Sequence, residues 1–200
     1  MSASTERPVD LELELDLSFH AASESHWTEP IDSESRNRLT SANAWEQELT
    51  TWIQSIRSDL TLTCPPEVRQ TQSLSLGLQL TDDANISELN ASWRQKPEAT
   101  DVLSFPALDN NIPMPGSSCV ELGDIVVSVT TAQRQAKEHQ HSLDRELRWL
   151  VSHGLLHLLG WDHPNSSSLD AMLSCQEHLL NNDGKVASHS DSIATITDDS

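Results

Sequence analysis

The residues that could do chemistry gather in one short run, "HGLLHLLGWDH", at positions 153–163. His153 and His157 are four residues apart, so on a helix both imidazoles project from the same face, one turn apart. Gly160 suits a left-handed residue after the helix end, where the chain can reverse and bring His163 back toward them. Three neutral imidazoles suit a borderline cation such as Zn²⁺ and leave a fourth position open to water. We therefore predict a metal centre at His153, His157 and His163.

The alternative is that each histidine is an ordinary core residue. Three buried imidazoles without a ligand would each need a separate hydrogen-bond partner, so a shared cation is the simpler explanation. The remaining histidines of the folded part, His139, His141 and His178, do not form such a set. We expect these three to be solvated or structural.

The run differs from the HExxH motif of common zinc proteases, because Gly154 stands where the general-base glutamate would be. A peptidase would have to find its base elsewhere. Asp162 could act as that base or could accept a hydrogen bond from a ligand imidazole, and the second role is the favoured one. On these residues alone, a zinc hydrolase such as a peptidase and a non-catalytic zinc protein both stay open.

Composition indicates one folded domain with acidic, polar ends. The chain has 200 residues and a formal net charge of −19, and only 36% of it is hydrophobic. We interpret residues 1–41 as an acidic N-terminal strand followed by a polar loop, 42–182 as the catalytic domain, and 183–200 as a disordered tail. Residues 42–182 still carry 18 acidic against 8 basic side chains, so a polyanion site would have to be a local cluster.

The sequence indicates a cytoplasmic protein without a membrane partner. It contains no run of eighteen apolar residues and no basic segment followed by an apolar one at its start. The three cysteines, Cys64, Cys119 and Cys175, are far apart and odd in number, which is typical of reduced intracellular thiols.

The elements that must position the histidines follow from hydrophobic periodicity. Alternation with period two predicts strands at 9–17 and 73–80, a short apolar run predicts one at 101–108, and a β-branched run predicts one at 121–129. Apolar residues at helical spacing and helix-capping residues predict helices at 43–60, 82–95, 130–140, 143–159 and 167–182. The sum is an α+β domain: a mixed sheet of about four strands packed with helices.

Four stretches together resemble the YbeY family of bacterial endoribonucleases, also called rRNA maturation factors. "HGLLHLLGWDH" is similar to the family signature H-G-x-L-H-L-x-G-[YW]-D-H. In order and spacing, "ISELNASWRQ", "TDVLSFP" and "LGDIVVSVTTAQRQA" match the family's N-x-x-[WY]-R helix, T-D-V-L-S-F-P strand and L-G-D-I-x-I-S strand. The resemblance covers roughly residues 43–182. One departure is the loop "QKPEATDVL", which lacks the usual K-D-x-P-T-D-V-L order.

The resemblance implies a zinc-binding helix at the floor of a cleft, with one Zn²⁺ ion held by His153, His157 and His163. It implies a metal-dependent, single-strand-specific endoribonuclease that acts in late-stage 70S ribosome quality control and in maturation of the 3′ terminus of 16S rRNA. Its partners would be rRNA or other single-stranded RNA and the ribosome or small-subunit proteins, with no DNA expected. The family's cleft arginine corresponds to Arg94, the catalytic candidate; a surface ion pair is the alternative role of that side chain.

Overall fold

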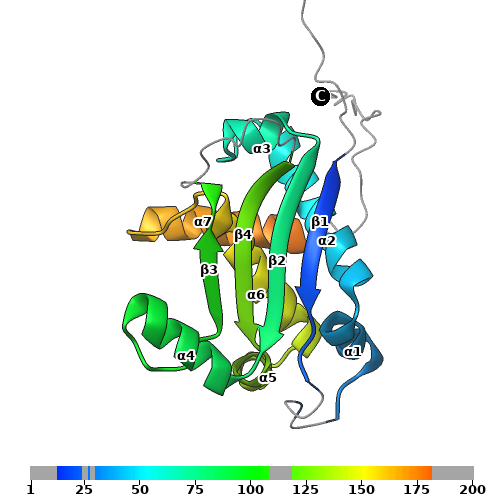
Figure 1. The fold of residues 1–200 in the computed structure, drawn as a ribbon, viewed down its shortest axis with the longest axis vertical. Coiled ribbons are helices and arrows are strands. Elements are labelled where there is room, and N and C mark those ends of the chain that lie inside the picture. Colours follow the sequence, from blue (N-terminus) through cyan, green and yellow to red (C-terminus); the bar gives the residue numbers. More distant parts are fainter. Residues whose placement is uncertain (1–12, 24–26, 28–29, 109–118, 182–200) are drawn as a thin grey trace, which may run out of the picture.

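The computed structural model describes residues 13–23, 27, 30–108 and 119–181. Its centre is one four-stranded sheet in the order β1-β2-β4-β3, made of β1 (Glu14–His20), β2 (Ser73–Thr81), β4 (Cys119–Ser128) and β3 (Val102–Pro106). β1, β2 and β4 run parallel, and β3 pairs antiparallel with β4. Figure 1 shows these strands side by side, with β1 and β3 at the two edges. The predicted α+β class with a mixed sheet of four strands is confirmed.

Helices α2, α6 and α7 lie behind the sheet in Figure 1, and α4 and α5 lie at its lower end. The face of the sheet that meets the helices is apolar: alternate residues of β2, from Leu74 to Leu80, are buried. The helices are α1 (Ser33–Thr40), α2 (Ala42–Ser58), α3 (Pro66–Gln70), α4 (Asp83–Arg94), α5 (Val129–Glu138), α6 (Leu143–Leu158) and α7 (Ser166–Asn181).

The core lies between the apolar sheet face and α2 and α6. Trp45 and Trp52 of α2 are almost completely buried in it, so they anchor the core, as their helical spacing predicts. The indole N–H of Trp45 donates to the backbone oxygen of Arg38 at 2.7 Å, so burying this ring leaves no unpaired donor.

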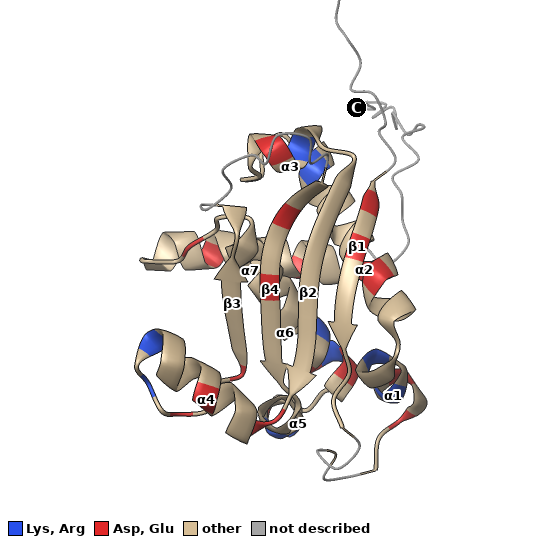
Figure 2. Ribbon diagram, in the orientation of Figure 1, with Lys and Arg blue, Asp and Glu red and all other residues tan. Residues whose placement is uncertain are grey.

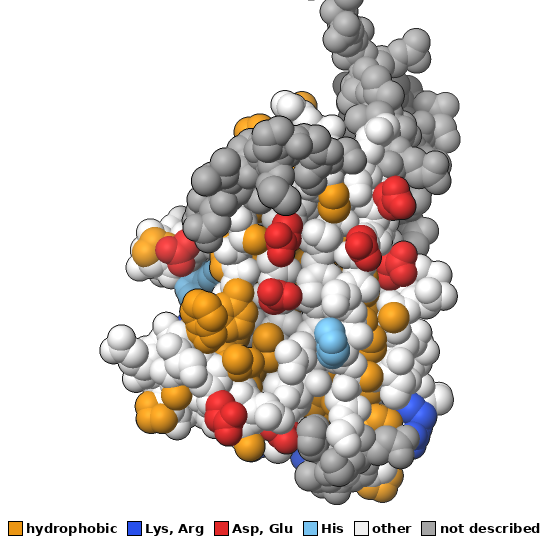
Figure 3. Space-filling view, in the orientation of Figure 1, with side chains coloured by type: hydrophobic (Ala, Val, Ile, Leu, Met, Phe, Trp, Pro, Cys, Tyr) orange, Lys and Arg blue, Asp and Glu red, His pale blue; other side chains and the backbone are white. Residues whose placement is uncertain are grey.

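The opposite sheet face is acidic over β1 and part of β4, and apolar where α4 packs on β3 and β4. Exposed Glu14 and Asp16 of β1 and Glu121 and Asp124 of β4 alternate with buried residues along their strands. Figure 2 shows these acidic positions on the strands, and Figure 3 shows acidic side chains spread over the face toward the viewer. This is the side away from α6 and its histidines.

The prediction of a polar loop through residue 41 is wrong for residues 33–40, which form α1. Asp32 caps this helix by accepting from the Ser35 backbone N–H at 2.8 Å. Only Ser35 and Leu39 of α1 are buried, so the helix leaves no apolar stripe that a sequence pattern could reveal. The short helix α3 was likewise not predicted.

Two local features shape the sheet end and β4. Asp82 caps α4, because its carboxylate accepts from the Asn85 backbone N–H at 2.8 Å. Gly123 lies inside β4, at a register shift against β2 and with φ +116°. A side chain there would meet the carbonyl oxygen of Phe105, so this bulge requires glycine.

Several predicted features, among them the tail at 183–200 and the start of the strand predicted at 9–17, lie outside the described residues. Within the described ranges, no helix is long and apolar enough to cross a membrane.

Candidate metal centre

Helix α6 carries the first two histidines and begins and ends as the sequence predicts. Ser142 caps it by accepting from the Arg145 backbone N–H at 3.2 Å. At the other end, Gly160 has φ +83°, its N–H bonds the His157 oxygen at 3.0 Å, and the Trp161 N–H bonds the Leu156 oxygen at 3.0 Å. These two bonds form a Schellman motif, which reverses the chain immediately after the helix.

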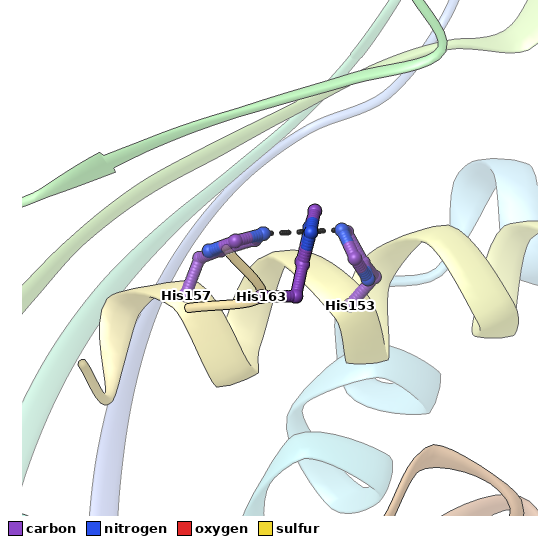
Figure 4. A group of neighbouring side chains, drawn as sticks. All are labelled: His153, His157 and His163. Atoms are coloured by element: carbon purple, nitrogen blue, oxygen red, sulfur yellow. Dashed lines mark hydrogen bonds between the residues drawn. The ribbon is translucent and has the colours of Figure 1, made fainter. Parts of the chain in front are cut away.

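The reversal brings His163 against the helix beside His153 and His157. The three residues, called here the histidine triad, each offer a ligand atom within 4.8 Å of the other two. The ring centroids of His163 lie 5.5 Å from His153 and 5.2 Å from His157. Figure 4 shows the rings of His153 and His157 projecting from the same side of α6, with His163 between them.

In His153 and His157, a hydrogen bond on the outer side of the ring decides which nitrogen faces the centre of the triad. Nδ1 of His157 lies 3.0 Å from the backbone oxygen of Trp161, and Nδ1 of His153 lies 3.2 Å from Oε1 of Gln176. Both oxygens can only accept, so each Nδ1 carries the hydrogen and each Nε2 presents a lone pair. The two Nε2 atoms are 3.1 Å apart, the approach marked by the dashed line in Figure 4.

Two lone pairs at this distance repel each other unless a proton or a cation lies between them. A Zn²⁺ ion binds imidazole nitrogen at about 2.0–2.1 Å, so tetrahedral ligands are about 3.3 Å from one another. The observed separation is close to that value. The three imidazoles therefore fit a borderline metal ion through their chemistry and proximity, and His153 and His157 also through their tautomers and spacing.

Burial keeps the first two ligands neutral. Burial lowers the pKa of His153, although the hydrogen bond to Gln176 acts in the opposite direction. Burial also lowers the pKa of His157, and repulsion from the other two imidazoles lowers it further. Because a metal binds only the neutral ring, both side chains are ready to act as ligands at neutral pH.

Gly154 has a packing role that explains why no glutamate stands there. Its Cα faces the sheet, and a Cβ at this position would lie 2.8 Å from Ile125 Cγ2 and 3.1 Å from Ser104 Oγ. A side chain at residue 154 would therefore enter the core rather than the metal centre. The HExxH arrangement is sterically excluded on this helix.

The described contacts of Asp162 show neither role that the sequence suggested, a general base or an acceptor for a ligand imidazole. Its Oδ1 accepts from the backbone N–H of His163 at 2.8 Å. It therefore fixes the backbone that presents the third ligand, and its charge also raises the pKa of His157.

Arg94 belongs to a different helix from His153 and His157, and that helix packs on the other side of the sheet. It lies exposed in the last turn of α4, where a cation is favourable at the helix C-terminus. α4 packs through Ile86 on Leu103 and Val126, whereas α6 packs on their neighbours Ser104 and Ile125, which face the other side of the sheet. Among the described residues, the side chain of Arg94 makes no hydrogen bond or ion pair, so the alternative of a surface ion pair gains no support.

The hydrogen-bond partners of the ligands escaped the sequence reasoning. Gln176 is fully buried in α7, and its Nε2 donates to the Trp149 oxygen at 3.1 Å, which turns Oε1 toward His153. A glutamine on the apolar side of a helix was the available signal. The sequence also treated His139 and His141 as unconnected, whereas the structure brings both onto Glu146.

Comparisons with known proteins identify relatives of this chain. The family model described as "Endoribonuclease YbeY" matches residues 31–184. A protein named "Endoribonuclease YbeY" from Prochlorococcus marinus (strain MIT 9313) is 62% identical over 189 residues, covering 94% of this chain and 100% of its own. Its namesake from Synechococcus sp. (strain CC9311) is 57% identical over 166 residues, 83% of this chain and 94% of its own.

The chain is also similar to the solution structure of TM1509 from Thermotoga maritima, with a TM-score of 0.47 and 18% identity over 90% of this chain and 100% of that one. The family match covers well over half of the chain, and the relatives are covered almost completely. The chain belongs to the YbeY endoribonuclease family.

Proposed function

We propose that this chain is a single-strand-specific, zinc-dependent endoribonuclease. Its substrate is rRNA, in the maturation of the 3′ terminus of 16S rRNA and in late-stage 70S ribosome quality control, and its partners are the ribosome or small-subunit proteins. The observation that carries the proposal is the convergence of three imidazoles, two of which have facing Nε2 lone pairs. Family membership supplies the substrate class.

The side chains of the histidine triad hold the ion through their inward-facing nitrogens. When bound, the ion supplies Lewis acidity toward a phosphoryl oxygen and lowers the pKa of a water molecule. Gln176 and the Trp161 carbonyl hold the ligand rings in the tautomer that leaves Nε2 free. Arg94 pairs with a phosphate through its planar guanidinium group and stabilises charge that develops on the phosphoryl oxygens.

The charge distribution limits where RNA can bind. The acidic face formed by β1 and β4 repels a phosphate backbone, so the RNA approaches at the edge strand β3, which α4 with Arg94 and α6 with the triad contact from opposite sides of the sheet. With a net charge of −19, the isolated protein binds RNA weakly and loses it as salt rises, or receives it on the ribosome.

The test is cleavage of a single-stranded 16S rRNA fragment by the purified full-length chain, compared with the same sequence in a duplex. We expect cleavage of the single strand only, loss of cleavage after chelation, and recovery on adding Zn²⁺. His157→Ala should reduce the cleavage rate at least 100-fold. His20→Ala, an exposed histidine on the opposite edge strand, is the matched control and should retain activity.

Two outcomes would reject the proposal. RNA cleavage that survives both chelation and His157→Ala would place the chemistry elsewhere. Zinc-dependent cleavage of peptides without cleavage of RNA would instead support a hydrolase of another class. A non-catalytic zinc protein would be indicated by a fourth protein ligand in the metal-bound structure together with no cleavage of either substrate.

A further inference from the structure

A second group of potential metal ligands lies at the opposite end of α6 from the histidine triad. His139 Nδ1 lies 3.1 Å from Glu146 Oε2, and His141 Nε2 lies 2.9 Å from the same oxygen. The two imidazole rings are 5.4 Å apart, and one atom of each of the three residues lies within 4.8 Å of the others. Glu146 and His153 are seven residues apart on one helix, about 10 Å along its axis, so the two groups are separate.

The turn between α5 and α6 creates this group. Residues two apart would face away from each other on a continuous helix. Here Gln140 takes the left-handed conformation, with φ +58°, and the His141 N–H bonds the Ala136 oxygen at 3.0 Å. A non-glycine residue in this conformation is uncommon. The turn swings both rings toward the first turn of α6, where Glu146 lies.

His141 lies between two oxygens that can only accept. Its Nδ1 is 3.1 Å from the backbone oxygen of Ser142, and its Nε2 is 2.9 Å from Glu146 Oε2. A neutral imidazole has one N–H and can donate to only one of them. A metal ion bound at Nε2 and Oε2 would satisfy the carboxylate and leave Nδ1–H to donate to Ser142.

The environment favours a cation bound by this set of atoms. The side chain of Glu146 is only 2% exposed, and a buried carboxylate needs a partner of opposite charge. The side chains of His139 and His141 are 56% and 24% exposed, so an ion can enter from solvent and keep water in its remaining positions. Two imidazoles with one carboxylate are typical ligands of Zn²⁺ and its transition-metal neighbours.

We propose that His139 Nδ1, His141 Nε2 and Glu146 Oε2 form a second divalent metal site of the zinc class, in addition to the histidine triad. The ion ties the end of α5 to the start of α6, the helix that carries the triad. The Ser142 carbonyl orients one ligand ring, as the Trp161 carbonyl does in the triad. Metal binding at this second site does not depend on RNA cleavage, so the second site and the proposed function can be tested and rejected separately.

The experiment counts Zn²⁺ equivalents bound by the full-length, metal-stripped chain, by calorimetric titration at pH 7.5 and by metal analysis after dialysis. We expect two equivalents for the wild type. Glu146→Gln keeps the side-chain volume and should lose one equivalent, and His141→Ala should weaken the same equivalent at least tenfold. His157→Ala removes a ligand of the triad instead, so it should keep the equivalent bound at Glu146.

Two controls keep the result decisive. Circular dichroism and thermal unfolding show whether each variant is folded. In the His157→Ala background, imidazole NMR signals of His139 and His141 should shift on addition of one Zn²⁺ equivalent. One equivalent in the wild type, or no shift of these signals, would overturn the second site and leave a direct contact between His141 and Glu146.

Discussion

Replacing Gln176 by leucine tests whether the partner of His153 controls metal binding. Gln176 is completely buried, and its Oε1 is the acceptor for the Nδ1–H of His153 at 3.2 Å. Leucine has a similar volume but no acceptor, so the ring loses the bond that fixes its tautomer and orientation. The effect on metal binding should therefore be large even though Gln176 contacts no metal.

The magnitude follows from the lost bond. Leaving a buried donor without a partner costs about 1–3 kcal/mol, and about 1.4 kcal/mol corresponds to a tenfold change in affinity. We expect Gln176→Leu to weaken Zn²⁺ binding by about 10- to 100-fold. The variant should also unfold more easily, because Gln176 Nε2 donates to Trp149 at 3.1 Å and to Ser152 Oγ at 3.3 Å.

Gln176→Glu separates these two effects. Glutamate keeps an acceptor for His153 but loses the donor toward the Trp149 carbonyl, so stability should fall while Zn²⁺ affinity stays near that of the wild type. Competition with a chromophoric chelator measures the affinity, and urea denaturation measures the free energy of unfolding. If Gln176→Leu binds Zn²⁺ within twofold of the wild type, the argued role of this hydrogen bond is refuted.

Two further predictions concern α6. In Gly154→Ala, the new Cβ would lie 2.8 Å from Ile125 Cγ2. Overpacking costs about 1–3 kcal/mol and outweighs the gain in helix propensity of about 1 kcal/mol, so thermal unfolding should show a net loss of stability near 1 kcal/mol. A stabilised variant would contradict the packing argument. Burial lowers the pKa of both His153 and His157, so between those values and the ordinary pKa near 6.5 the unfolded chain binds more protons than the folded chain. The free energy of unfolding of the metal-free protein should therefore fall as pH falls through about 6.5. Urea denaturation should show a smaller fall in a His153→Ala/His157→Ala variant. Equal falls in the two proteins would contradict the assignment of this pH dependence to the two histidines.

Much of the architecture was predictable because its signals are local. Alternation predicted β1 and β2, apolar and β-branched runs predicted β3 and β4, and helical spacing predicted the long helices, each within a few residues of its observed bounds. The exceptions have a common cause. Residues 33–40 bury only two side chains and α3 has five residues, so neither has enough apolar residues to produce a periodic pattern.

Part of the metal centre was also predictable from local sequence, and part was not. The spacing of His153 and His157 and the glycine at position 160 determined that the triad would converge, because helix geometry and the left-handed turn follow from sequence neighbours. Its supporting bond from Gln176 comes from another helix, 23 residues away, and no local pattern encodes that contact.

The sequence by itself determined the α+β fold class, the positions of most elements and the convergence of the triad, because these depend on interactions between near neighbours. Only the tertiary structure decided which nitrogen each imidazole presents, why residue 154 must be glycine, and that His139 and His141 meet on Glu146. Those features depend on contacts between elements whose relative positions are set by packing of the whole core.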